Sequence, residues 1–232
     1  MRTRRGSLHV IWLVVVTSAL LLPGVASAQW RNPITGGMFN NPLSPALDEQ
    51  ILHAMQKRML ESSIQARKPA KGKARPKHQA LTKTDFKPAH KGRPAEIMFL
   101  DSLKLDTDQR RQFQEALDAS FNLVNTQLRK NNVATSYGFV IGTSLEVVTG
   151  KQSTDEADKE LIAGINDQLA AAPEFTKLTV KDKQTLSDTL VLTGALLVIL
   201  HSAGEKDPSM KDASISMAKA VLTQLTGSAT GS

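Results

Sequence analysis

Large apolar residues recur at spacings of three and four through most of the chain beyond residue 94. This period places them on one face of an α-helix, whereas a half-buried strand would alternate apolar and polar residues. No segment alternates over strand length, and the sequence has no Asn-Gly or Asp-Gly hairpin turn. The pattern predicts an all-α domain. Its clearest face combines Phe113, Leu117, Phe121, Val124 and Leu128.

Local stop and start signals divide this pattern into about six helices, packed as one compact bundle over residues 84–227. Ser153 and Glu156 have the spacing of a capping box, and Thr179 is placed to cap the next helix. Gly150 supplies a left-handed helix end. The most apolar run, 190–200, should lie in the central helix because apolar residues cover most of its circumference.

The first 28 residues have the organisation of a cleavable export signal. Arg2, Arg4 and Arg5 precede an apolar run at 10–22, and a small-residue segment (VASA) follows at 25–28. We predict cleavage after Ala28, which makes Gln29 the first residue of the mature protein. An uncut membrane anchor is the alternative, but the run is shorter than the roughly 18 residues that span a bilayer. The expected location is the bacterial periplasm or the extracellular medium, with no stable transmembrane segment after processing.

Between the signal and the bundle we expect three segments. Residues 29–44 are rich in Asn, Gly and Pro and should be irregular. Residues 45–66 carry one apolar stripe, which predicts an isolated amphipathic helix that docks on the bundle, self-associates or lies on a membrane. Residues 67–83 are too polar to offset the entropy of ordering, which predicts a disordered basic linker. Residues 228–232 form a short tail.

The net charge of +7 is unevenly distributed. Residues 57–93 hold twelve basic and two acidic side chains, whereas residues 94–227 hold thirteen basic and eighteen acidic ones. The predicted bundle is therefore acidic, and the basic character belongs to the linker and leader. The linker is either a solvated spacer or a contact for an anionic envelope polymer. No nucleic acid is expected, because aromatic residues do not interleave the possible polyanion contacts Lys68, Lys71, Lys73, Arg75, Lys77 and Lys83.

The sequence contains no cysteine, which excludes disulfides and thiolate sites. Phosphate-binding glycine loops and a nucleophile elbow are also absent. His53 and His201 lack neighbours at metal-ligand spacing, and His201 is expected to act as a cation at a helix C-terminus. Gly138, Gly142 and Gly194 fall inside predicted helices, where they suggest close helix crossings. No catalytic, cofactor-binding or metal-binding residue is predicted.

Three ordered segments give the chain a resemblance. They are 84–88 (TDFKP) followed by Arg93, 131–134 (NNVA) leading into a helix that ends at 149–150, and 183–184 (KQ) before the apolar helix. Over residues 84–227 the chain resembles an uncharacterised helical domain of exported bacterial proteins. This resemblance implies the helical fold and export, but no activity.

Together these features predict an exported binding or interaction module of the bacterial periplasm or cell envelope, with an unknown protein or an envelope polymer as partner. They favour a binding protein over an enzyme and indicate no oligomeric state. The alternative is an envelope hydrolase with a carboxylate-based site. Its candidate carboxylates are Glu146, Glu156 and Asp188.

Overall fold

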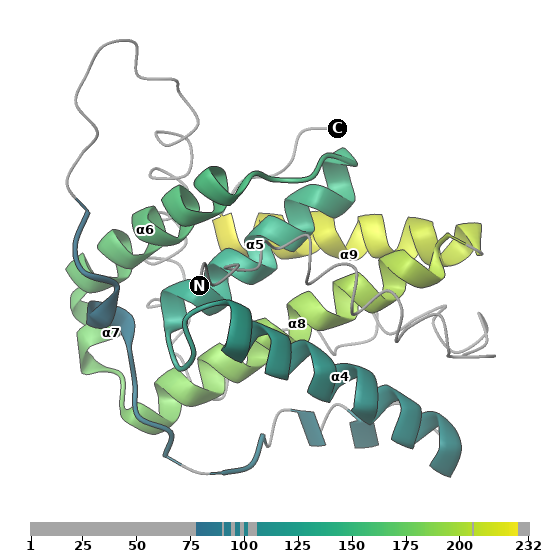
Figure 1. The fold of residues 1–232 in the computed structure, drawn as a ribbon, viewed down its shortest axis with the longest axis horizontal. Helices are drawn as coiled ribbons and strands as arrows, with labels where there is room; N and C mark the ends of the chain where they lie inside the picture. Colours follow the sequence, from purple (N-terminus) through teal and green to yellow (C-terminus); the bar gives the residue numbers. More distant parts are fainter. Residues whose placement is uncertain are drawn as a thin grey trace, which may run out of the picture.

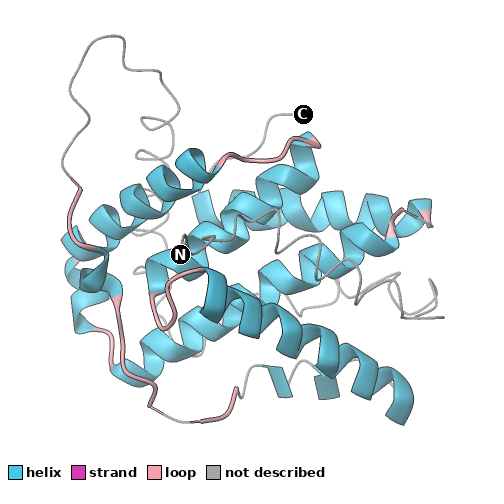
Figure 2. Cartoon of the chain, in the orientation of Figure 1, coloured by secondary structure: helices cyan, strands magenta, loops and turns pink. Residues whose placement is uncertain are grey.

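The computed structural model describes residues 78–89, 91–93, 96–97, 100–101, 106–205 and 207–226. Within these ranges the chain forms six α-helices and one short 3-10 helix, without any strand (Figures 1 and 2). The all-α prediction is confirmed. The helices are η1 (Leu81–Thr84), α4 (Thr107–Gln127), α5 (Val133–Thr149), α6 (Asp155–Ala171), α7 (Pro173–Lys177), α8 (Val180–Ala203) and α9 (Pro208–Thr226).

The core lies where α5 and α8 pack against each other, with α4, α6 and α9 around them (Figure 1). Both central helices are apolar around most of their circumference, so both must be covered by neighbours. Leu197 of α8 and Val140 of α5 have no exposed surface, and the predicted face of α4 is buried from Phe113 to Val124. The prediction that 190–200 lies in a central helix is confirmed.

Helix α8 also extends well beyond the predicted apolar run. It has 24 residues and, by length and composition alone, could cross a membrane, although 78% of its apolar window is buried inside the bundle. Burial of this kind is typical of the core helix of a globular domain.

Two of the three local signals place their helix ends as predicted. Thr179 caps α8 through a full capping box with Asp182, and Gly150 ends α5 at a φ of 64°. The third prediction is wrong by one residue. Thr154, not Ser153, caps α6 by accepting from the Ala157 amide, while the Ser153 amide donates to the Glu146 carboxylate at 3.0 Å. Both hydroxyl residues can cap a helix, so the position depended on this tertiary contact.

The chain before the bundle contributes an ordered segment, residues 78–89 and 91–93, that we call the strap. It passes beside α6 and below the start of α8 (Figure 1). The predicted disordered linker, 67–83, therefore needs correction at its end. Residues 78–83 include most of η1 and make hydrogen bonds to α6, so order begins no later than His78. The predicted export signal, the predicted irregular segment 29–44, the predicted helix 45–66 and linker residues 67–77 lie outside the described residues.

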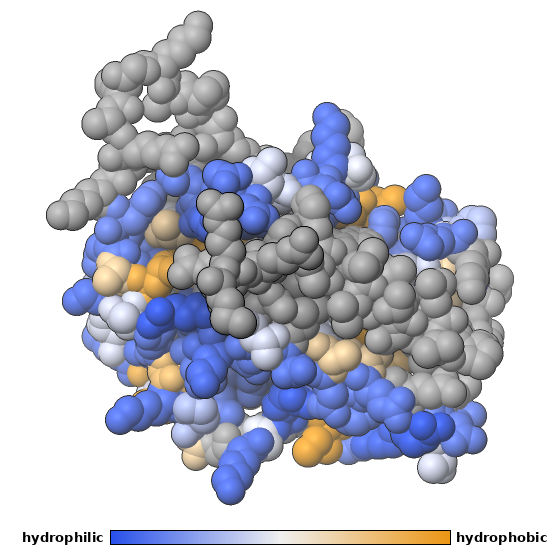
Figure 3. Space-filling view, viewed as in Figure 1, coloured by the Kyte–Doolittle hydropathy of each residue, from blue (hydrophilic) through white to orange (hydrophobic). Residues whose placement is uncertain are grey.

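Figure 3 shows a mostly hydrophilic face over the described part of the chain. Two large apolar residues among the described ones are strongly exposed, Ile97 at 55% and Val180 at 46%. Isolated exposures of this kind are ordinary for a folded domain.

Candidate functional site

The strap is attached to the bundle by a buried polar cluster centred on Asn132. This residue caps α5, since its Oδ1 accepts from the Thr135 amide at 2.8 Å. Its Nδ2 donates back to the strap, to Leu81 O at 2.8 Å and to Thr84 Oγ1 at 2.9 Å. Asn132 and Thr84 are 1% and 0% exposed. One side chain thus starts a helix and holds the strap against it.

Thr84 extends the cluster to α6. Its hydroxyl donates to Asn166 Oδ1 at 3.0 Å, and Asn166 Nδ2 donates to the carbonyls of Gln79 and Ala80. Asn166 has no exposed surface. The strap, the α4–α5 loop and α6 therefore share one buried network, in which each member depends on the others for its partners.

An ion pair closes the outer side of the cluster. Asp85 accepts hydrogen bonds from Arg129 and also from Asn132 Nδ2, the latter at 2.8 Å. The bonds from Arg129, followed by that from Asn132, hold the pKa of Asp85 below its usual value against the opposing effect of burial. Next to it, the Phe86 amide donates to Asn131 O at 2.9 Å, with Asn131 in the left-handed region at a φ of 52°.

His78 attaches the start of the strap to α6. Its ring nitrogens lie 2.7 Å from Asp167 Oδ2 and 3.0 Å from Glu160 Oε1. The Gln79 amide donates to the other Asp167 oxygen at 2.8 Å. The hydrogen bond to Asp167, and then that to Glu160, raises the pKa of His78, although burial acts the other way. The two carboxylates therefore favour the protonated form of the imidazole over its neutral form.

This geometry predicts a pH-dependent contribution to stability. Because the folded pKa of His78 is raised, its contribution is complete below the unfolded value near 6.5 and is lost as the pH rises through the folded pKa. We expect His78→Gln to lower the free energy of unfolding by about 1 kcal/mol at pH 5.5, and by clearly less at pH 9. Urea unfolding at both pH values measures this. An equal loss of unfolding free energy at both pH values would show that the charge of His78 does not contribute to stability.

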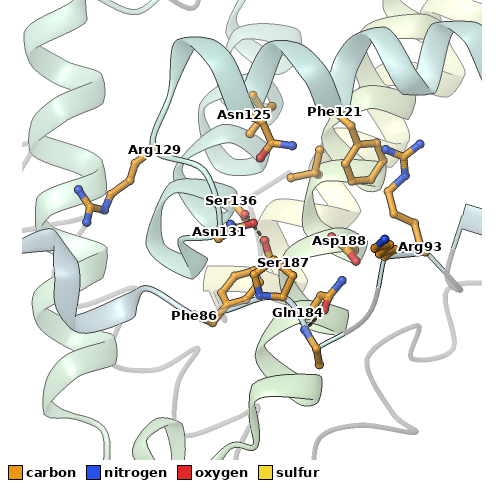
Figure 4. A pocket seen from close by; sticks show the side chains of 16 residues that line it. Phe86, Arg93, Phe121, Asn125, Arg129, Asn131, Ser136, Gln184, Ser187 and Asp188 are labelled. Atoms are coloured by element: carbon orange, nitrogen blue, oxygen red, sulfur yellow. Dashed lines mark hydrogen bonds between the residues drawn. The ribbon is translucent and has the colours of Figure 1, made fainter.

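A cavity of about 470 Å³ lies beside the cluster. The strap, α4 with the loop after it, the start of α5 and the first half of α8 all contribute to its lining. Figure 4 shows Phe86 and Phe121 on opposite sides, with Ser136, Ser187 and Asp188 between them. The volume is in the range of pockets that hold small ligands, about 300–1,000 Å³.

Arg93 and Arg129, both in the lining, already have carboxylate partners. Arg93 pairs with the buried Glu96 and with Asp118, and its guanidinium lies 4.3 Å from the centroid of the Phe121 ring. Glu96 in turn accepts from Gln114. Burial acts to lower the pKa of Arg93, but the combined hydrogen bonds and charges of Glu96 and Asp118 outweigh it and raise that pKa. Arg129 pairs with Asp85, as described above.

The inner wall is neutral and polar. Ser136 Oγ and Ser187 Oγ lie 2.7 Å apart, and Ser136 also donates to the Asn132 carbonyl at 3.2 Å. Gln184 Oε1 accepts from the Ala89 amide at 2.7 Å, so α8 holds the strap at the cavity. The cavity is therefore tied to the Asn132 cluster on one side and to α8 on the other.

The three segments behind the family resemblance meet here. Residues 84–88 and 131–134 bond to each other at Asn132, and Arg93 and Gln184 line the cavity. Lys183 turns to α7, where its Nζ lies 4.6 Å from the centroid of the Phe175 ring. Each of these segments is too short to be specific on its own, but the fold brings them together in space.

The three candidate carboxylates do not share a site. Asp188 lines the cavity. Glu146 is buried near the far end of α5, ten residues or about 15 Å of helix beyond Ser136, and accepts from Ser153. Glu156 is exposed in the first turn of α6. No group of three potential metal ligands occurs among the described residues.

The remaining predicted residues have mixed outcomes. Lys83 lies in the last turn of η1 and is exposed. Lys68, Lys71, Lys73, Arg75 and Lys77 lie outside the described residues, as do Ala28 and Gln29, so those assignments stay predictions. His201 is in the last turn of α8, but burial lowers its pKa and weakens its role as a cation there. The Asn132 cluster was not predicted, and of the candidate residues that the structure describes only Asp188 lies in the cavity wall.

Fold and site together define a compact all-α domain with a mixed polar cavity under an N-terminal strap. The model of a family of unknown function, DUF6683, matches residues 10–229, and the chain belongs to this family. This confirms that the chain belongs to an uncharacterised domain family, and the match is wider than the predicted 84–227. No curated protein and no solved structure matches the chain.

Proposed function

We propose that the protein is an exported bacterial binding module, which acts in the periplasm or cell envelope and holds a small ligand in the cavity beneath the strap. Export is supported by the arginines, apolar run and small-residue site of residues 1–28. Binding is supported by one observation above all. Four separate parts of the fold converge on a 470 Å³ cavity that combines aromatic, amide, hydroxyl and charged side chains.

The alternative of a carboxylate hydrolase has less support from the geometry. Two carboxylates must flank one bond, about 5 to 10 Å apart, for that mechanism. Asp188 lines the cavity, but the carboxylates of Asp85, Glu96 and Asp118 are held by arginines at its edge. A binding role requires no such pair.

Asn125 offers a test because it is exposed on α4 and extends toward the site in Figure 4. We expect Asn125→Trp to fill the cavity without disturbing the core. In a thermal-shift screen of sugars, amino acids, organic acids and polyamines, compounds that raise the wild-type melting temperature should lose that effect in Asn125→Trp. The protein is prepared by export of the full-length chain, so its intact mass also reports whether Gln29 is first.

The matched control is Asn122→Trp, three residues earlier on the same helix and also exposed, but outside the lining. Asn122→Trp should keep every ligand-induced increase in melting temperature that the wild type shows. If no compound stabilises the wild type, or if both tryptophan variants respond like the wild type, the cavity is not a ligand site.

A further inference from the structure

We infer that the cavity takes an uncharged ligand rich in hydroxyl groups, such as a single sugar unit. This rests on the proposed binding function and names its ligand class. The inference combines the charge balance of the cavity, the hydrogen-bonding groups of its wall and the placement of its apolar side chains.

The charges around the cavity disfavour ions of either sign. The lining holds three basic side chains, of Lys91, Arg93 and Arg129, which would repel a cation. An anion would have to compete for the two arginines with carboxylates already bound to them. Together with Asp188, these three partners make four carboxylates around three basic groups. The charges therefore nearly balance, and the site has no large net charge that would attract an ion. A neutral ligand avoids displacing any existing ion pair, which would leave a partly buried charge without its partner.

The wall offers donors and acceptors in mixture, as a sugar does. Asn125 and Asn131 each carry an amide that can donate and accept, and Asp188 supplies acceptor oxygens. Ser187 shares its hydroxyl bond with Ser136, which has the Asn132 carbonyl as a further acceptor. If Ser136 donates to that carbonyl, Ser187 donates to Ser136 and retains lone pairs for a ligand hydroxyl. A hydroxyl group, as donor and acceptor, fits each of these partners.

Apolar side chains complete the match. Phe86 lies on one side of the cavity and Phe121 on the other, where Arg93 covers part of the Phe121 ring. Val124 and Val191 add aliphatic surface. The C–H faces of a sugar ring can pack on such surfaces while its hydroxyls reach the amides and the carboxylate. The volume leaves room for one such ring and bridging water.

The test uses calorimetry on the protein obtained by export of the full-length chain, with matched sugar probes that share one ring. Glucose, galactose, mannose and N-acetylglucosamine are the neutral probes, and glucosamine and glucose 6-phosphate are the charged ones. We expect at least one neutral sugar to bind, and the charged forms to bind at least tenfold more weakly. Asp188→Asn should weaken binding of the neutral sugar about tenfold, because a charged acceptor is replaced by a neutral one. Asp212→Asn, exposed on α9, should leave it unchanged.

The outcomes separate the ligand class from the binding function. Tighter binding of glucosamine or glucose 6-phosphate than of every neutral sugar overturns the inference, as does the absence of neutral-sugar binding. In either case the binding function stands if the wider screen gives a compound that Asn125→Trp loses. Should Asp188→Asn unfold, Asn125→Trp remains as a second variant, and a neutral sugar that it still binds also overturns the inference.

Discussion

Asn132→Asp should lower the free energy of unfolding by about 3 kcal/mol at pH 7, although it changes only one amide group to a carboxylate. The capping oxygen stays, so Thr135 keeps its partner. The second oxygen replaces the Nδ2 that now donates to the strap, and it faces the Leu81 carbonyl and the Asp85 carboxylate. At a position 1% exposed, water cannot compensate, and Arg129 is already paired with Asp85.

The pH dependence of this variant identifies the cause. Burial and the negative charge of Asp85 should raise the pKa of the new carboxyl in the folded state. Its folded form then binds more protons than its unfolded form, so the deficit should narrow as the pH falls from 7 toward 4.5. Chemical denaturation of the variant and the wild type at several pH values measures this difference in the free energy of unfolding. Asn122→Asp, exposed on α4, should stay within about 0.5 kcal/mol of the wild type. A deficit independent of pH would point to lost packing instead of a buried charge.

The helices could be predicted from the sequence because their information is local. An apolar period fixes which face of α4 is buried, and Thr179 with Asp182 fixes where α8 begins. Gly150 is similar, since a left-handed helix end favours the residue without a Cβ. These features depend on residues one or two turns apart, within reach of a pattern.

The cluster and the cavity could not be predicted in this way because their partners are far apart in sequence. Asn132 bonds to Thr84, 48 residues earlier, and Thr84 bonds to Asn166, 82 residues later. Polar residues carry no period that marks them as buried. His78 illustrates the opposite error. Its neighbours in sequence are basic and predict disorder, but Glu160 and Asp167, both on α6, order it.

In the sequence, the site was indicated only by the order of the three segments that carry the family resemblance. Residues 84–88, 131–134 and 183–184 had no common function in the sequence, and the fold brings parts of each to one place. Helix glycines were a second long-range signal. Close crossing was predicted at Gly138, Gly142 and Gly194. At Gly138 and Gly194 an added Cβ would collide with a side chain of another helix, and for Gly142 the prediction stays untested.

Gly194→Ala tests the crossing of the two central helices. A Cβ at this position would lie 2.5 Å from Cε1 and 2.7 Å from Cδ1 of Phe139. That ring is 1% exposed, so it cannot swing into solvent. Inserting a methyl group into a close-packed core typically costs about 1–3 kcal/mol, and we expect the upper end here, about 3 kcal/mol in the free energy of unfolding.

A matched glycine separates this clash from the general effect of alanine in a helix. Gly164 lies inside α6 and has nothing within 4 Å of an added Cβ, so Gly164→Ala should stabilise the protein by about 0.5–1 kcal/mol. Phe139→Leu opens the space that the new methyl group needs. The double variant should therefore lose less free energy of unfolding than the sum of the losses in the two single variants. Urea unfolding of the wild type, the two single variants and the double variant gives this coupling, and the same measurement on Gly164→Ala gives the control. Additive losses would mean that α5 and α8 do not approach each other at Gly194.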